Sequence, residues 1–523
     1  MAREKEILLT QLKDLIHVMD STEIEIAKKH IVAYDSVTKN ESQKMFTLFT
    51  KFLSISDIDY ERLKEKVSPS ITDFSFNRLL RRTLYRIQES LISDVNLRRK
   101  NLYDDLFRKR YEIRKGIMQA SIIKGKGLPH MSKRLFDNII KNCKKYELYD
   151  EIIEALNYKQ SIVMFSKGGK SYHDLNNEMN FYNNCRRLLN KTKRIHRSYM
   201  TELFTKGGKD QKISYLEKNI AISYKYYEET SSQNIRSYCL LLKMELDYLK
   251  DDFDNEEKTG VELLNLMAEN KAVYSKGRII FICNSLGNSM ISNLKFKESY
   301  SYIKKSLENF DKRNLNYINA LQLQITSLFY SGKHAEAEAL VKELTSIKLL
   351  EKYTFYQAFS TYIIALNKFA LAQFKDAYVL LSNLKEIEKD KEGWNVWIRI
   401  MRILCSIEML RLNLIDYDVE NFRKYIQRID KLYEVRKRDK LVLKVLRDLD
   451  RFNYDFKIVA EKSASTLNQL RSTDDYLKWD PKSPEMILFH DWFDAKLEKR
   501  EYSPNFDLYR ERLNKKLIVR QVN

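Results

Sequence analysis

Apolar residues recur at helical spacing along most of this chain, beginning close to its first residue. Leu8, Leu12, Ile16 and Met19 are three or four positions apart. Residues at that spacing share one face of an α-helix, and polar residues occupy the other faces. The pattern therefore predicts one or two helices within residues 1–38.

The strongest break in the first half of the chain follows a long helical stretch. A helix is predicted from about Asp94 to Ser121, and residues 124–129 then contain two glycines and a proline. Glycine and proline destabilise a helix interior, so this break marks a boundary. Beyond it, helical patterns cover residues 131–144, 147–165, 171–205, 212–229, 233–251 and 258–272.

An internal repeat begins near Gly277. In each copy a ring-bearing residue stands three positions before a small residue, and apolar residues follow three or four positions later. The rings are Phe296, His334 and Phe374, at intervals of 38 and 40 residues, and the small residues are Ser299, Ala337 and Ala377. A weaker fourth copy is predicted to begin at Tyr417.

A further apolar helix precedes each copy of the repeat. These helices are predicted over Ile279–Leu294, Tyr317–Tyr330, Tyr353–Leu371 and Trp394–Leu414. Two amphipathic helices per roughly 40 residues, repeated, are typical of an α-solenoid, in which each pair buries its apolar face against its neighbours. We expect the small residue to admit a neighbouring helix closely and the ring to fill the gap beside the turn.

Three segments of the repeat resemble the turn and second-helix opening of a tetratricopeptide repeat (TPR). They read Tyr-Ser-Gly-Lys-His-Ala-Glu-Ala at 330–337, Ala-Gln-Phe-Lys-Asp-Ala at 372–377 and Leu-Lys-Phe-Lys-Glu-Ser at 294–299. The resemblance covers roughly residues 277–430, but the period exceeds the usual ~34 residues and the first helices lack the Trp-Leu-Gly signature. It implies a concave surface suited to a peptide or helix and transfers no catalytic residue.

Sparse turn residues favour the same architecture. The 523 residues include twelve Gly and five Pro, and no proline occurs from residue 130 to residue 480. A β-rich chain needs turn residues throughout, whereas stacked helix pairs do not. We therefore predict an all-α protein with a basic N-terminal helical domain at 1–128, a TPR-like α-solenoid of stacked helix pairs at 129–452, and C-terminal capping helices with a tail at 453–523.

Aromatic residues gather in the last of these regions. Trp479, Trp492 and Phe493 lie near Pro481 and Pro484. Such a cluster anchors a terminal helix, either on the end of the solenoid or on a partner. Because the exposed end of a repeat array is poorly soluble, we favour the capping role.

Other features indicate a cytoplasmic protein. No apolar run approaches the ~18 residues of a membrane span, and residues 1–6 lack the apolar core of a secretory signal. The cysteines are widely spaced and odd in number, which is typical of buried thiols in a reducing compartment. They are Cys143, Cys185, Cys239, Cys283 and Cys405.

Positive charge is concentrated in the N-terminal part of the chain. The net charge is +21, of which residues 51–200 contribute +15 and residues 201–523 contribute +7. Such asymmetry suggests an anionic partner. The alternative is a lysine-rich solvated surface, as expected of a protein from an AT-rich genome.

Two stretches carry most of this charge. Residues 78–134 contain 16 Lys and Arg against 5 Asp and Glu, spread around the helical wheel, and the candidate contacts there are Arg98, Arg99, Arg108 and Arg110. Residues 179–201 contain no acid, and their six candidate cations fall within an arc of roughly 160° on a helical wheel. These are Arg186, Arg187, Lys191, Lys193, Arg194 and Arg197.

The function of this cationic stripe is open from sequence. It could follow the phosphates of a nucleic acid, or it could hold an acidic protein segment, because an electrostatic field does not distinguish them. A solvated helix face is the third interpretation. No zinc finger, RNA-recognition or helix-turn-helix signature accompanies the stripe.

No pattern of catalytic or metal-binding residues stands out. Residues 165–171 end in Gly-Lys-Ser, like a phosphate-binding loop, but Met164 stands where that loop needs its first glycine. A similar Lys-Gly-Gly-Lys occurs at 206–209. We therefore predict that both segments are helix C-caps with left-handed glycine. The seven histidines never pair at ligand spacing, and His490 followed by Asp491 is common by chance.

We therefore expect no cofactor, no metal and no enzymatic activity. The favoured function is a TPR-like scaffold or adaptor that binds a protein or peptide through the solenoid surface. The alternative is an RNA- or DNA-associated protein that binds phosphates through its basic N-terminal third.

Overall fold

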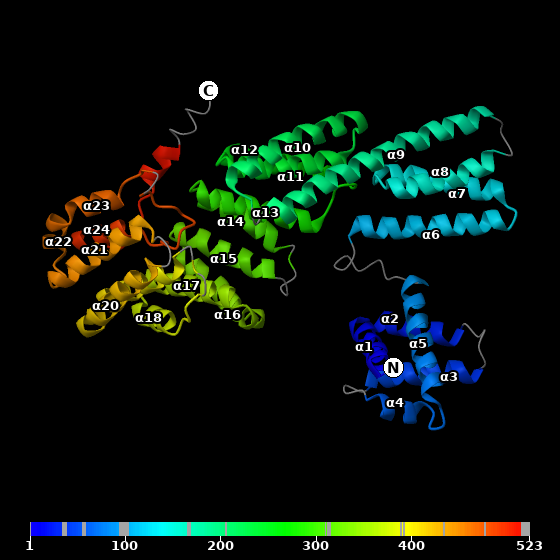
Figure 1. Ribbon diagram of the computed structural model, residues 1–523, viewed down its shortest axis with the longest axis horizontal. Helices are drawn as coiled ribbons and strands as arrows, with labels where there is room; N and C mark the ends of the chain where they lie inside the picture. Colours follow the sequence, from blue (N-terminus) through cyan, green and yellow to red (C-terminus); the bar gives the residue numbers. More distant parts are fainter. Residues whose placement is uncertain are drawn as a thin grey trace. The chain divides into compact units, whose positions relative to one another are not determined.

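The computed structural model is helical and contains no strand in the part of the chain that it describes. That part comprises residues 2–33, 39–54, 59–93, 104–164, 169–203, 207–308, 310, 315–387, 390, 393–431, 435–474 and 477–513. The prediction of an all-α protein is confirmed (Figure 1).

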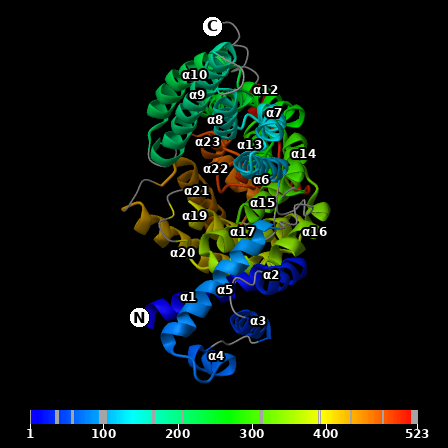
Figure 2. The ribbon, with the colours of Figure 1, turned by 90° about the vertical axis from the view of Figure 1, so that its right-hand side faces the viewer.

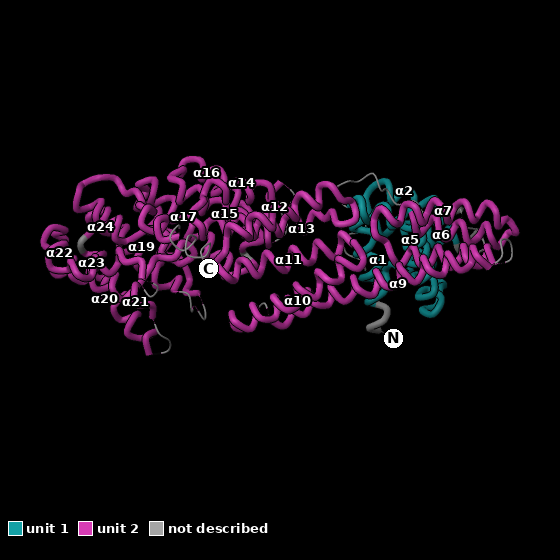
Figure 3. The backbone as a smooth tube through the Cα atoms, turned by 90° about the horizontal axis from the view of Figure 1, so that it is seen from above, with its two compact units in different colours: residues 1–112 teal, residues 113–523 magenta. Residues whose placement is uncertain are grey.

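The chain forms two compact units, residues 1–112 and 113–523 (Figure 3). The division falls inside one helix, α6 (Asp105–Gly125), whereas the sequence placed a boundary at residue 128. The Gly-rich break proves to be a turn between two helices of the second unit. Gly127 has the left-handed φ of +81° that glycine adopts without strain.

The first unit has its own apolar core. Its helices besides α6 are α1 (Ala2–Val18), α2 (Ser21–Ala33), α3 (Lys39–Ser54), α4 (Tyr60–Val67) and α5 (Asp73–Ser93). The apolar positions at helical spacing point inward, so that Leu12, Ile16, Phe49 and Phe76 are buried in one cluster. Packing of this kind, rather than intrinsic propensity, stabilises helices of such length.

The second unit is a succession of packed helices. They are α7 (Pro129–Lys145), α8 (Tyr149–Val163), α9 (Gly169–Ser198) with a π-helical turn (Tyr199–Leu203), α10 (Lys209–Thr230), α11 (Gln233–Leu249), α12 (Phe253–Glu269), α13 (Lys276–Ser292), α14 (Phe296–Leu307), α15 (Leu315–Tyr330), α16 (His334–Thr345), a 3₁₀ turn (Lys348–Lys352), α17 (Thr354–Ala370), α18 (Phe374–Ser382), α19 (Trp394–Glu408), α20 (Leu412–Ile429), α21 (Lys437–Arg451), α22 (Phe456–Lys462), α23 (Ala464–Leu470) and α24 (Phe489–Glu498). From α7 to α20, contacts run mainly between neighbours along the chain. The predicted solenoid of stacked helix pairs is confirmed.

Six turns inside helix pairs share one backbone design. The second residue after the first helix is left-handed, and the amide of the residue that follows it donates back across the turn, as Lys333 does to the carbonyl of Leu328 at 2.9 Å. These bonds satisfy carbonyls that the helix end leaves free. The left-handed residues are Glu147, Asp251, Leu294, Gly332, Ala372 and Leu410.

The predicted fourth copy of the repeat is out of register. A single helix was expected over residues 394–414 and a second helix from Tyr417, but α19 ends at Glu408 and α20 begins at Leu412. Leu410 makes the turn with a φ of 55° while its side chain is 82% exposed. Because leucine is an unusual left-handed residue, composition gave no signal for this turn.

The small repeat residues lie at close helix contacts. Ser299, Ala337 and Ala377 are fully buried, and the Ser299 hydroxyl donates to the carbonyl of Gly287 on α13 at 2.7 Å. A Cβ added at Gly287 would lie 2.4 Å from Cγ1 of Ile303 on α14. Small residues on both helices therefore set the separation within this pair.

The repeat rings pack against aromatic residues at the end of a first helix. Phe296 stacks on Tyr330 with ring centroids 5.0 Å apart. His334 meets the edge of Phe329 at 5.2 Å, and Phe374 meets Phe369 at the same distance. Each ring thus closes the apolar space beside a turn.

The C-terminal segment, here residues 477–493, lies along the first helices of several pairs (Figures 1 and 2). The hydroxyl of Tyr330 on α15 donates to the carbonyl of Pro481 at 3.1 Å, and that of Tyr362 on α17 donates to Pro484 at 2.6 Å. The indole of Trp492 donates to Glu408 on α19 at 2.8 Å. The segment therefore covers a face of the solenoid, in addition to its last pair.

A buried ion pair fixes this segment. Arg438 on α21 and Glu485 are 5% and 0% exposed, with Nη2 and Oε1 2.8 Å apart. The Arg438 guanidinium also donates to the carbonyls of Leu470 and Leu477. Its donors are thus shared between a carboxylate and the backbone, as a buried charge requires.

Candidate binding surface

Helix α9 separates an apolar side from a cationic side. Its buried positions follow helical spacing and pack into the solenoid; they are Leu175, Cys185, Leu188, Leu189 and Thr192. The six predicted cations occupy the opposite side, the cationic stripe. Arg187, Lys191, Arg194 and Arg197 are exposed, and Arg186 and Lys193 are half-buried.

Neighbouring helices engage the two edges of the cationic stripe. Arg186 lies 3.3 Å from Asp150 on α8, and the ammonium of Lys191 lies 5.9 Å from the ring centroid of Tyr226 on α10. Among the described residues, the guanidinium groups of Arg194 and Arg197 make no ion pair. A solvent-accessible ion pair such as Arg186 with Asp150 contributes little stability. The stripe therefore retains most of its positive electrostatic field.

The four predicted cations of residues 78–134 do not form a comparable face among the described residues. Arg98 and Arg99 lie outside the described residues. Arg108 is half-buried and paired with Asp105, and Arg110 is exposed. These residues belong to the first unit and the cationic stripe to the second.

One of the two Lys-Gly-Gly-Lys turns, at 206–209, differs from the prediction of a left-handed C-cap. Residues 165–168 lie outside the described chain, and Gly169 already begins α9. Gly208 is extended, with a φ of −65°, and caps the N-terminus of α10. Lys209 pairs with Asp251 at 3.2 Å. Gly208 is therefore the N-cap of α10, not a left-handed C-cap of the preceding helix.

His490 and Asp491 are buried and engaged in internal contacts. His490 lies 3.3 Å from the Arg438 guanidinium, and burial together with Arg438 lowers the pKa of His490 to about 3. Asp491 accepts the amide of Asn505 at 2.7 Å. Within the described ranges, no three His, Cys, Asp or Glu side chains gather as a metal site.

The cysteines are all buried and unlinked by disulfides. Burial raises the pKa of Cys185 to about 11 and that of Cys239 to about 12. Thiols with such pKa values remain protonated and are poor nucleophiles. In the described part of the chain, none of the helices has the length and apolarity of a membrane span.

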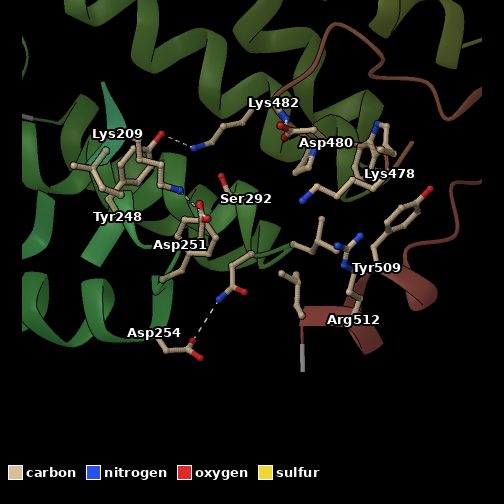
Figure 4. A pocket seen from close by; sticks show the side chains of 17 residues that line it. Lys209, Tyr248, Asp251, Asp254, Ser292, Lys478, Asp480, Lys482, Tyr509 and Arg512 are labelled. Atoms are coloured by element: carbon tan, nitrogen blue, oxygen red, sulfur yellow. Dashed lines mark hydrogen bonds and ion pairs between the residues drawn. The ribbon is translucent and has the colours of Figure 1, made fainter. Parts of the chain in front are cut away.

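A cavity of about 370 Å³ opens beside the C-terminal segment (Figure 4). It is bounded by the turn between α11 and α12, the turn between α13 and α14, and the C-terminal residues 478–482 and 509–513. Sequence reasoning missed this site, because its C-terminal wall is more than 180 residues from the two turns that form its other walls. The only local signal was the Trp- and Pro-containing run near Trp479.

No protein-family model matches the chain, and no curated protein matches it in sequence.

Proposed function

We propose that this chain is a non-enzymatic helical-repeat scaffold that holds an acidic protein segment on the cationic stripe of α9. The observation that carries the proposal is the pair of exposed guanidinium groups, Arg194 and Arg197, on a helix whose other side is packed in the solenoid. A rigid helix that displays several cations on one side supplies a pre-formed site for carboxylates.

The position of the C-terminal segment supports this choice of surface. A solenoid commonly binds partners through its first helices, but Tyr330 and Tyr362 already donate hydrogen bonds to the chain's own backbone. α15 and α19 are each buried at twelve positions, which is typical of helices covered on several sides. A partner segment is therefore better accommodated on α9.

An acidic protein segment suits the stripe better than a nucleic acid does. From Arg187 to Arg197 the stripe extends about 15 Å, at 1.5 Å per residue. Single-stranded nucleic acid usually also requires aromatic rings on which bases stack. One ring beside the stripe, that of Tyr226, already lies beneath the Lys191 ammonium.

A binding titration with two matched ligands tests the proposal. A fluorescent peptide of glutamate residues and a single-stranded RNA of equal charge are titrated with the full chain at several salt concentrations. We expect the peptide to bind more tightly, and the variant R187E/R194E to weaken it by about tenfold or more, since each charged contact contributes about 1.5–3 kcal/mol.

The control is K457E/K462E, which reverses two exposed lysines of α22. It should leave peptide binding nearly unchanged. Tighter RNA binding that R187E/R194E abolishes would favour the nucleic-acid function. Equal binding by all three proteins would show that the stripe is only a solvated face.

A further inference from the structure

The turn between α6 and α7, together with the helix ends beside it, protrudes from the second unit. All residues from Gly125 to Met131 are exposed, and a Cβ added at Gly125 or Gly127 would meet nothing within 4 Å. The left-handed φ of Gly127 reverses the chain there. The described part of the chain therefore leaves this turn uncovered.

Large apolar side chains surround the turn and face solvent. Ile122 at the end of α6, Leu128 in the turn and Met131 at the start of α7 are each more than half exposed. We call these three residues the apolar tip. Apolar side chains that are exposed singly are common on proteins, whereas a group beside one turn indicates a surface for an apolar partner.

Positive charge surrounds the apolar tip. Residues 113–136 contain six Lys and Arg and no Asp or Glu. Lys126 and Arg134 are exposed and make no ion pair with a described residue. Asp137, the first acid after the turn, is paired with Lys133 at 3.3 Å and with Lys159 at 2.7 Å. The two unpaired cations are therefore available to an anionic partner.

The same end of the second unit carries a further exposed apolar side chain and a further cation. α7 packs on α8 and α8 packs on α9, each pair running in opposite directions (Figure 1). Met164 after α8 and Lys170 on α9 therefore lie at the end where α7 begins, and both are exposed.

Apolar side chains beside unpaired cations match the surface of a bilayer that contains anionic lipids. The apolar groups enter the boundary between headgroups and acyl chains, while Lys and Arg remain near the lipid phosphates. An amphipathic helix of an acidic partner usually binds in a hydrophobic groove. A protruding turn instead presents its side chains to a flat surface, which favours a membrane.

We infer that the apolar tip binds the surface of an anionic phospholipid bilayer. Ile122, Leu128 and Met131 enter the interface, and Lys126 and Arg134 face the lipid phosphates. The contact is peripheral and needs no spanning helix. It does not depend on the scaffold function proposed for the cationic stripe.

A fluorescent reporter at the apolar tip tests this inference. The five native cysteines are buried, so Leu128→Cys in the full chain is labelled selectively with nitrobenzoxadiazole, whose emission moves to shorter wavelength in apolar surroundings. Vesicles of phosphatidylcholine with about one third phosphatidylserine should shift this emission, and vesicles of phosphatidylcholine alone should shift it much less. The same label on Leu410→Cys, at an exposed turn, should not respond.

Cosedimentation of unlabelled variants with the anionic vesicles separates the apolar and the charged contributions. L128S/M131S should weaken binding by about tenfold or more, because less apolar surface enters the interface. K126E/R134E should weaken it by a similar factor, because the attraction to the lipid phosphates is lost. All four side chains are solvent-accessible, so neither variant should disturb folding.

Matched controls make the same kinds of change at exposed positions elsewhere in the second unit. They are L410S/I458S and K457E/K462E, and both should bind the vesicles like the original chain. Equal weakening by these controls would overturn the inference.

Other results would also overturn it. These are no binding to the anionic vesicles at about 1 mM lipid, binding without an emission shift at residue 128, and loss of binding in R187E/R194E but in neither tip variant. The last result would place the lipid contact on the cationic stripe. A shift at residue 128 caused by a glutamate peptide and not by vesicles would assign the apolar tip to an acidic protein instead.

Discussion

At the scale of single residues, burial shifts the pKa of one carboxyl group, that of Glu256, far above its ordinary value. Glu256 on α12 is 2% exposed, and its Oε2 has no hydrogen-bond partner. Burial raises the pKa of Glu256 to about 8, and the carboxyls of Glu245 and Asp247 act in the same direction, against the ammonium of Lys482. The folded protein therefore holds this proton more tightly than the unfolded chain does.

We predict that Glu256 makes stability depend on pH. Its pKa rises from 4.5 to about 8 on folding, so its contribution is largest below pH 4.5 and is lost as the pH rises through 8. Glu256→Gln should change stability little at pH 5 and raise it by about 3–5 kcal/mol at pH 8.5, since each pKa unit corresponds to about 1.4 kcal/mol. Urea unfolding at the two pH values measures the difference.

The control for this prediction is Glu298→Gln, which alters an exposed carboxyl on α14. It should leave the pH profile of unfolding unchanged. The prediction would be contradicted if the free energy of unfolding of Glu256→Gln varied with pH in the same way as that of the original chain.

At the scale of elements, a recurring turn is made by different residues in successive pairs. Gly332 and Ala372 occupy equivalent positions, with φ of 70° and 58°. Glycine adopts this conformation freely, whereas an L-residue is strained there by roughly 1–2 kcal/mol. A Cβ added at Gly332 would meet nothing within 4 Å, so backbone strain alone distinguishes the two turns.

We predict opposite effects of reciprocal substitutions at these turns. Ala372→Gly should stabilise the second unit, and Gly332→Ala should destabilise it, each by about 1 kcal/mol. Gly277→Ala is the control, because Gly277 is helical and a Cβ there would lie 4.0 Å from its nearest neighbour, the Ser275 hydroxyl. Equal destabilisation by Ala372→Gly and Gly332→Ala would refute this account of the turn.

At the scale of the whole molecule, the second unit is closed by contacts between distant residues. Trp479, Phe489 and Trp492 share one apolar cluster with residues of α15, α17 and α19. Arg438 and Glu485 lie within the same region. Burial of several large aromatic side chains stabilises such docking by about 1.5–3 kcal/mol each.

We predict that Glu485→Gln destabilises the second unit by about 3–5 kcal/mol, because Arg438 is left as an unpaired buried charge. Glu420→Gln, which removes an exposed partner of Arg423, is the control and should have little effect. Replacing both members of the buried pair, as Arg438→Met with Glu485→Leu, should restore part of the loss. Denaturant unfolding measures all three variants.

Helix positions were predicted correctly where the repeat signal was local. The rings at Phe296, His334 and Phe374 open helices α14, α16 and α18, as the repeat predicted. The predicted cations of α9 fall on one side of the helix for the same reason. Helical periodicity depends only on residues three or four positions apart, and each repeated pair packs mostly on its neighbours.

The sequence by itself therefore determined the all-α class, the paired helices and the two-sided character of α9. Only the tertiary structure decided that Leu410 makes a turn, that residues 477–493 cover the first helices, and that Lys482 reaches Tyr248 to close a cavity. These features depend on strain, on docking and on contacts across more than 200 residues. None of these features produces a periodic pattern in the sequence.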